Sequence, residues 1–216
     1  KLIDYPAPPV AICSLGDGSV TEGEVAEAFQ FACLHQLPII YLVQDNDWGI
    51  SVSSDEARTM DAYEYAAGFK GLERVRVNGS DFEDSYKTME YTIDWVRKER
   101  KPILVHAKVP LLGHHTSGVR KEWYRTEEDL FKHSLNDPGP KLRKRLLEIK
   151  GVTEEQLDAI EAEELAYVQQ EFANATAAAE PDPATVAEHV FAPTKITEEK
   201  GTRTPAGRDK VVMVDA

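Results

Sequence analysis

Four short runs that favour β-strands are spaced along the first half of the chain. The first two are apolar, as expected for strands buried on both faces of a sheet. The runs lie at residues 10–15, 38–43, 74–78 and 103–109. Helical periods separate the runs, so the pattern predicts an α/β fold with a doubly wound, mainly parallel sheet and right-handed crossovers.

Two long helices are predicted between these strands. Thr21 and Glu24 have the spacing of a capping box, which predicts a helix from there to about Gln36. Asp81 is expected to cap a second helix that runs to about Arg100. The side chains expected to face the sheet are Val25, Ala28, Phe29, Ala32 and Gln36 on the first helix and Phe82, Tyr86, Met89, Ile93 and Val96 on the second.

From Asn136 onward the pattern is helical only. Pro138 begins one predicted helix and Gly151 follows it. Thr153 and Gln156 form a second expected capping box, at the start of a long helix. The apolar stripe expected to be buried on that helix consists of Leu157, Ile160, Leu165, Val168 and Phe172.

These changes of pattern predict four segments. Residues 1–135 form the α/β domain, without its N-terminal part, and residues 136–192 form a helical extension. Residues 193–210 are polar and aperiodic, which is typical of a linker. Residues 211–216 are apolar again and are interpreted as the start of a further domain. The chain is therefore expected to be an interior piece of a longer polypeptide.

Composition narrows the class of protein. The chain has 216 residues and a net charge of −13, which argues against nucleic acid as a partner. It has no signal peptide and no apolar run of about 18 residues, so neither export nor a membrane is indicated. Cys13 and Cys33 lie in apolar segments and are expected to be reduced core residues of a cytoplasmic protein. The basic stretch 141–145 is either a docking surface or a solvated helix face.

The segment QDNDWGISVSSDE, residues 44–56, has two incompatible interpretations. Its acidic and hydroxyl side chains follow the spacing of a calcium-binding loop. That loop requires glycine at its sixth position, where this chain has Ile50, and a helix before it, where this chain has an apolar β-branched run. The calcium interpretation is rejected on both counts.

The second interpretation pairs this segment with the GDGS sequence at residues 16–19. Asp17 follows one predicted strand and Asn46 follows the next, 29 positions later. Carboxylate and amide oxygens suit magnesium, and phosphate oxygens would complete its shell. Gly18 lets the backbone approach a phosphate, and the amides after it lie at a predicted helix start, where anions are favoured. The pair therefore predicts a site for magnesium and a phosphate group.

The motif resembles the thiamine diphosphate signature, in which GDG is followed 25 to 30 residues later by asparagine. GDGSVTEGEVAEAFQFACLHQLPIIYLVQDNDWGIS resembles, more specifically, the alpha subunit of the 2-oxo acid dehydrogenase first component. GHHTS, EWYRT and PDPATVAEHVFA follow in that family's order. The resemblance extends from about Val10 to Ala192.

The resemblance implies a role for individual residues. Asp17 and Asn46 would be magnesium ligands through their side chains, and Trp48 through its carbonyl oxygen. His115, on the loop that closes the site, would be catalytic and would lie by the diphosphate and the substrate. The cofactor-binding positions would be Gly18, Ser19, Gln44, Ile50 and His115.

Three positions depart from the family pattern. Gln44 and Leu111 stand where arginine is usual, and Asp45 stands where asparagine is usual. The changes leave the metal ligands intact but remove two positive charges, so the phosphate contacts of the family do not carry over directly. Thr116 and Thr126 align with serines that are phosphorylated in some relatives, which leaves regulation by phosphorylation open.

The resemblance implies oxidative decarboxylation of a 2-oxo acid and acyl transfer to a lipoyl-bearing acyltransferase, in the cytoplasm or, in a eukaryote, the mitochondrial matrix. A beta subunit, or a fused beta part beginning near KVVMVDA, would supply the other half of the site. The HHTS sequence favours a branched-chain substrate, while pyruvate and acetoin stay open. A transketolase-like transfer has no support, and a non-catalytic interaction domain that has lost the cofactor is the rival from another class.

Overall fold

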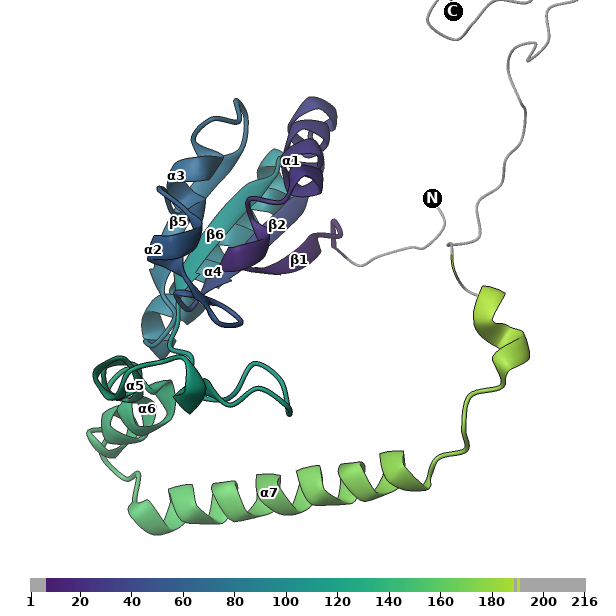
Figure 1. Ribbon diagram of the computed structural model, residues 1–216. Helices are drawn as coiled ribbons and strands as arrows, with labels where there is room; N and C mark the ends of the chain where they lie inside the picture. Colours follow the sequence, from purple (N-terminus) through teal and green to yellow (C-terminus); the bar gives the residue numbers. More distant parts are fainter. Residues whose placement is uncertain (1–6, 189, 191–216) are drawn as a thin grey trace, which may run out of the picture. The chain divides into compact units, whose positions relative to one another are not determined.

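The computed structural model describes residues 7–188 and residue 190 (Figure 1). The chain forms two units, residues 1–161 and residues 162–216, and each is considered by itself. The first unit contains a four-stranded sheet in the order β1-β2-β6-β5, in which every neighbouring pair is parallel. Its strands are β1 (Ala11–Gly16), β2 (Ile39–Asp45), β5 (Glu73–Asn78) and β6 (Ile103–Lys108). The predicted strands and the parallel α/β fold are confirmed.

Helices cover both faces of this sheet. On one face, α1 (Gly23–His35) and α3 (Ala62–Ala66) pack on β2, where Phe29 contacts Tyr41 edge-on at a centroid distance of 4.7 Å. On the other face, Val96 of α4 (Phe82–Glu99) packs against β2, β5 and β6. The chain moves across the sheet in one direction from β1 to β5 and then returns to β6, so right-handed crossovers place α4 opposite α1 and α3.

The burial predicted for the first strand is wrong. Residues 10–15 were expected to be covered on both faces, but β1 lies at the edge of the sheet and pairs, among the described residues, with β2 only. Its Ile12 side chain is 54% exposed. An apolar run gives the hydrophobicity of a strand, whereas its position in the sheet depends on which neighbours it acquires.

Two predictions about the long helices also fail. The Thr21–Glu24 box does not form, because a 3-10 turn, η1 (Asp17–Ser19), follows β1 and α1 begins only after Glu22, which has no side-chain cap. On α4 the expected Asp81 cap is present, but Phe82 and Tyr86 are exposed. A helix of 18 residues is about 27 Å long and a strand of six about 20 Å, so its first turns run past the strands. Ala28 on α1 and Gln36, which caps its C-terminus, are likewise exposed.

Helices follow the sheet to the end of the first unit and beyond. They are α5 (Glu127–Ser134), α6 (Pro138–Leu147) and α7 (Glu154–Ala177), with a 3-10 helix η3 (Pro183–Ala187) after them. The second expected capping box is confirmed, because Thr153 and Gln156 exchange hydrogen bonds of 2.9 and 3.3 Å. Arg143 of α6 binds Glu154 and Glu161 of α7 at 2.5 and 2.9 Å.

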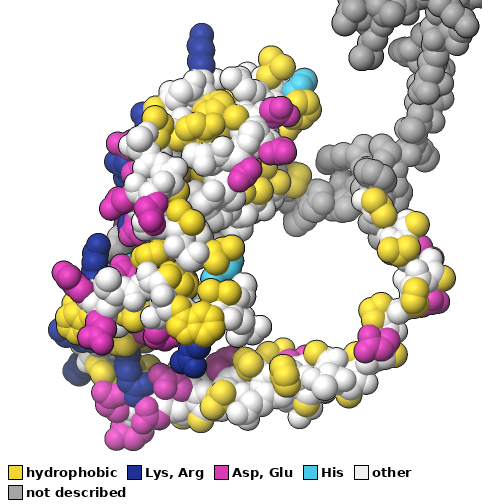
Figure 2. Space-filling model, in the orientation of Figure 1, with side chains coloured by type: hydrophobic (Ala, Val, Ile, Leu, Met, Phe, Trp, Pro, Cys, Tyr) yellow, Lys and Arg dark blue, Asp and Glu magenta, His cyan; other side chains and the backbone are white. Residues whose placement is uncertain are grey.

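The apolar stripe predicted to be buried on α7 is largely exposed. Only Leu157 is buried, while Ile160, Leu165, Val168 and Phe172 are exposed, and hydrophobic side chains are visible along this helix in Figure 2. A helix by itself cannot cover its own stripe. No helix within residues 7–188 is both long and apolar enough to cross a membrane. The predicted linker and the segment 211–216 lie outside the described residues, and the predicted division after residue 135 stays a prediction.

Candidate functional site

Two segments that lie far apart in the sequence meet at the carboxyl edge of the sheet. Gly16 pairs with Gln44 at the ends of β1 and β2, so the turns that follow both strands leave from the same place. The second turn continues into a small hairpin of β3 (Trp48–Gly49) and β4 (Val52–Ser53). Gly18 and Gly49 are so close that a Cβ added at Gly18 would lie 3.3 Å from the Gly49 Cα. The expected convergence of the GDGS and QDNDWG segments is therefore present in the fold.

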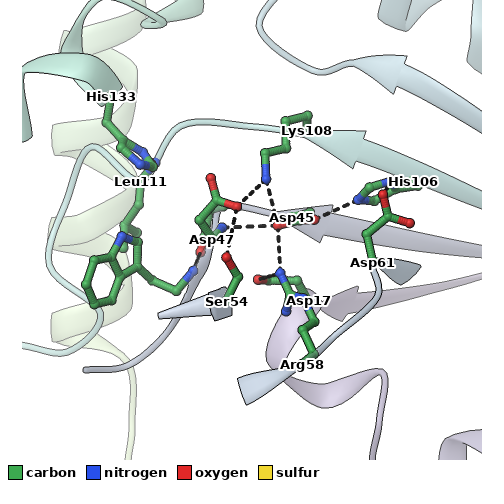
Figure 3. Close-up of polar contacts among 12 residues, drawn as sticks. Asp17, Asp45, Asp47, Ser54, Arg58, Asp61, His106, Lys108, Leu111 and His133 are labelled. Atoms are coloured by element: carbon green, nitrogen blue, oxygen red, sulfur yellow. Dashed lines mark hydrogen bonds and ion pairs between the residues drawn. The ribbon is translucent and has the colours of Figure 1, made fainter. Parts of the chain in front are cut away.

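A buried ion pair joins these two segments to a third. The Arg58 guanidinium lies 2.6 Å from the Asp17 carboxylate and 3.1 Å from the Asp45 carboxylate (Figure 3). The three side chains are 9%, 3% and 2% exposed. Arg58 follows α2 (Ser54–Ala57), a single helical turn. One buried cation thus serves two buried carboxylates at the edge of the sheet.

Asp45 has the richer set of partners of the two carboxylates. Its Oδ2 lies 2.7 Å from His106 Nε2, and its Oδ1 lies 3.3 Å from Lys108 Nζ, which also contacts Asp47. Burial alone would raise the pKa of Asp45, but hydrogen bonds with His106 and the Asp47 amide and the charges of Lys108 and Arg58 outweigh burial. They hold the pKa of Asp45 well below its usual range, so Asp45 is a carboxylate.

Asp17 differs from Asp45 although both are buried. Burial raises the pKa of Asp17, the hydrogen bond from Arg58 lowers it, and the neighbouring Asp45 charge raises it again. The net direction is upward. The Asp17 carboxylate is therefore the less satisfied of the two and gains more from an added cation.

The QDNDWG segment has an unusual backbone. Asn46 Oδ1 accepts a hydrogen bond from the Trp48 amide at 3.0 Å, which closes a tight turn. Asp47 has φ +68° and Ile50 has φ +59°. A left-handed conformation is uncommon for a β-branched residue and is found mainly where the surroundings enforce it. The strain at Ile50 adds an independent sign that this turn has a function.

The remaining predicted cofactor contacts line the same edge. Ser19 Oγ donates to the Gly16 carbonyl at 2.8 Å, which fixes the 3-10 turn. Gln44 is exposed and accepts a hydrogen bond from Ser14 at 2.9 Å. Arginine is usual at this position in the family that the sequence resembles, so its positive charge is missing from this edge of the sheet. Gly18 and Ile50 are exposed and accessible to a ligand.

His115 stands apart from this cluster. It is exposed on the loop between β6 and α5, and no hydrogen bond or ion pair within the described residues joins it to Asp17, Asn46 or Trp48. The far end of that loop does reach the site, because the Trp48 ring lies 5.5 Å from the Tyr124 ring and 5.5 Å from the Arg125 guanidinium. Thr116 is exposed, and Thr126 caps α5.

Sequence reasoning missed three members of the cluster, namely Arg58, His106 and Lys108. His106 and Lys108 left a signal, since they are the polar residues in the run 103–109, which is otherwise apolar. The His106 Nδ1 is buried without a hydrogen-bond partner among the described residues and lies 3.8 Å from Asp61. Arg58 left none, because nothing in its neighbourhood in the sequence points to Asp17.

Comparison with known proteins identifies the family. The model of the dehydrogenase E1 component family matches residues 7–184. The chain belongs to the dehydrogenase E1 component family. It is 35% identical to the pyruvate dehydrogenase E1 component subunit alpha of Rickettsia conorii over 149 residues, 68% of this chain and 45% of that protein. It is 31% identical to the 3-methyl-2-oxobutanoate dehydrogenase subunit alpha of Mycobacterium tuberculosis over 134 residues, 62% of this chain and 36% of that protein. The chain thus spans less than half the length of these E1 relatives.

The donor set of the edge fits a magnesium ion bound through few protein ligands. Asp17 offers a buried carboxylate, Asn46 an amide oxygen and Trp48 a carbonyl oxygen, which are the hard oxygen donors that magnesium prefers. Arg58 already places a cationic group on Asp17, which shows that this carboxylate accepts a positive charge. No cluster of three or more His, Cys, Asp or Glu side chains suited to a metal occurs among residues 7–188. A site of one carboxylate plus substrate phosphates does not require one.

Proposed function

We propose that this E1 chain holds the magnesium and diphosphate half of a thiamine diphosphate site in a 2-oxo acid dehydrogenase. The single observation that carries the proposal is the approach of Gly18 to Gly49, which places the GDGS turn against the QDNDWG turn at the carboxyl ends of parallel strands. Ligands of open α/β sheets bind at this edge. The family membership supports the same location.

Each residue of the edge has a proposed task. Asp17, Asn46 and the Trp48 carbonyl hold magnesium. Gly18 and Ser19 offer backbone amides to the diphosphate, with Gln44 and Ile50 beside them. Asp45, with His106 and Lys108, fixes the strand end from which Asn46 and Trp48 project, so the metal ligands start from a rigid base.

The cofactor, when bound, supplies the electron sink for decarboxylation of the 2-oxo acid. His115 is the proposed catalytic residue of this chain and donates a proton or a hydrogen bond to the reacting substrate from the loop before α5. Its exposure leaves it accessible to ligands. A beta subunit or fused beta part completes the site, and a lipoyl-bearing acyltransferase receives the acyl group.

For the substrate, we propose a branched-chain 2-oxo acid on the basis of the two adjacent histidines His114 and His115 in the loop. Pyruvate is the second candidate, because an alpha subunit of pyruvate dehydrogenase is the relative with 35% identity. Decarboxylation assays with 3-methyl-2-oxobutanoate and pyruvate, run side by side on the assembled enzyme, separate the two by their ratio of kcat/KM. Relatives include a mitochondrial subunit from Kluyveromyces lactis, which fits a proposed location in the cytoplasm or the mitochondrial matrix.

The test of the cofactor site is a calorimetric titration of thiamine diphosphate into the full-length protein with its beta partner. We expect binding in magnesium and none in EDTA, and we expect Asp17→Asn to abolish the magnesium-dependent part. Asp94→Asn, an exposed carboxylate on α4, is the matched control and should bind as the wild type does. A folded assembly that binds no cofactor would favour the rival function, an interaction domain without catalysis.

A further inference from the structure

Arg58 holds the carboxylate that the proposed site needs for its metal. Its guanidinium donates to Asp17 Oδ2 at 2.6 Å, and both side chains are at least nine-tenths buried. A divalent ion on Asp17 and the Arg58 guanidinium compete for the same carboxylate, because two cations held close together on one buried carboxylate repel each other strongly where water is excluded. The guanidinium and the metal ion therefore exclude each other from Asp17.

The second carboxylate explains why a cation is present at all. Asp17 and Asp45 are both buried at the sheet edge, and two adjacent buried carboxylates without a counter-charge would be strongly destabilising. Arg58 reaches both of them. Asp45 keeps His106 and Lys108 when Arg58 is gone, whereas Arg58 is the only cationic partner of Asp17 among the described residues. A metal ion on Asp17 would thus supply the positive charge that Arg58 supplies there.

A hollow beside the ion pair offers space for a displaced Arg58 side chain. The residue lines this hollow of about 420 Å³, whose walls carry further carboxylates, Asp55, Asp61 and Glu64. It is held by its backbone amide, which donates to the Ser54 carbonyl at 3.0 Å at the end of the single-turn helix α2. Short elements with exposed hydrogen bonds are the parts of a protein that open at low cost. The guanidinium can move into the hollow and find a new carboxylate without unfolding the sheet.

We propose that Arg58 is an internal counter-ion that competes with the divalent metal for Asp17 and so sets the metal affinity of this chain. The inference rests on the proposed function, since it takes Asp17 as a metal ligand. While Arg58 occupies Asp17, only the fraction of molecules with Arg58 displaced binds metal, and the apparent dissociation constant rises by the inverse of that fraction. With a displaced state of about 1–10%, the competition weakens metal binding by roughly ten- to a hundredfold.

The test uses manganese(II), whose electron paramagnetic resonance signal reports free ion directly, in the full-length protein with its beta partner and with thiamine diphosphate present. Arg58→Gln is expected to bind manganese roughly ten- to a hundredfold more tightly than the wild type. Arg58→Lys keeps the charge and is expected to stay within a few-fold of the wild type. Arg76→Gln is the matched control, because Arg76 lines the same hollow but pairs with Asp61 at 2.6 Å instead of Asp17.

The outcomes separate this inference from the proposed function. Wild-type binding that Asp17→Asn abolishes, together with unchanged or weaker binding in Arg58→Gln, leaves the cofactor site standing and overturns the competition. No binding in any variant overturns both. Should Arg58→Gln fail to fold, Arg58→Met, which keeps an unbranched apolar side chain in place of the Arg58 stem and leaves Asp45 with His106 and Lys108, takes its place, and the same tightening is expected there. An equal tightening of manganese binding in Arg76→Gln would also contradict the proposal. It would mean that the net charge of the hollow, and not the occupation of Asp17 by Arg58, sets the metal affinity.

Discussion

The sheet edge around Asp17 and Asp45 and the loop that carries His115 contribute to one proposed site but are built differently. At the edge, buried carboxylates are matched by Arg58, His106 and Lys108, and the two turns touch at Gly18 and Gly49. The His114–Gly118 stretch is exposed throughout. In the proposed site, the part assigned to metal and phosphate is thus held by ion pairs within this chain, while the part assigned to the reacting substrate is exposed.

The largest loss of stability is expected from Asp45→Ala. The substitution removes the shared partner of Arg58, His106 and Lys108 and leaves buried polar groups without a match. We expect the free energy of unfolding to fall by about 3–5 kcal/mol in a denaturant titration. Asp94→Ala, on the exposed face of α4, should change it by less than about 0.5 kcal/mol. Similar small losses for both variants would mean that the edge cluster is no more structural than a surface ion pair.

A smaller loss is expected from Gly18→Ala. The new Cβ would meet the Gly49 backbone at 3.3 Å, and a backbone neighbour cannot turn aside as a side chain can. We expect a loss of about 1–3 kcal/mol and weaker cofactor binding, because the two turns must separate. Gly23→Ala places a Cβ at the start of α1, where no atom lies within 4 Å. That control should fold as well as the wild type or slightly better.

The pH dependence of stability is expected to reveal the contrast between the two carboxylates. The lowered pKa of Asp45 gives the folded state stability above about pH 4, the unfolded value, and this stability is lost as pH falls below it. The raised pKa of Asp17 has the opposite sign, because its protonation on acidification favours the folded state. Unfolding curves from pH 7 to pH 2 should therefore show a shallower loss of stability below about pH 4 in Asp45→Asn than in the wild type. A parallel shift of the two curves would argue against this assignment.

The smallest effect on stability is expected from His115→Ala. The side chain is exposed, so the free energy of unfolding should change by less than about 0.5 kcal/mol. Decarboxylation by the assembled enzyme should fall at least a hundredfold if His115 acts on the reacting substrate. His114→Ala is the neighbouring control, since His114 Nδ1 accepts a hydrogen bond from the Lys121 amide inside the loop. Equal losses of activity in both variants would indicate that the loop, and not His115, matters.

Local patterns predicted the elements better than they predicted which surfaces become buried. The four strands, the Asp81 cap and the Thr153–Gln156 box followed from residue types and short spacings, and all are present. The Thr21–Glu24 pair has the same spacing but lies beside a 3-10 turn that postpones the helix. A capping box forms only if the residues before the helix also have a suitable conformation. The motif itself describes only the residues at the start of the helix.

The candidate site divides in the same way. The amino-acid sequence by itself determined that GDGS and QDNDWG leave the carboxyl ends of neighbouring parallel strands, because strand polarity and a single helical crossover allow little else. Only the tertiary structure decided that Arg58, 41 residues after Asp17, lies on its carboxylate, and that His106 and Lys108 secure Asp45. Contacts between side chains of distant segments depend on how whole elements pack, and no spacing along the chain encodes them.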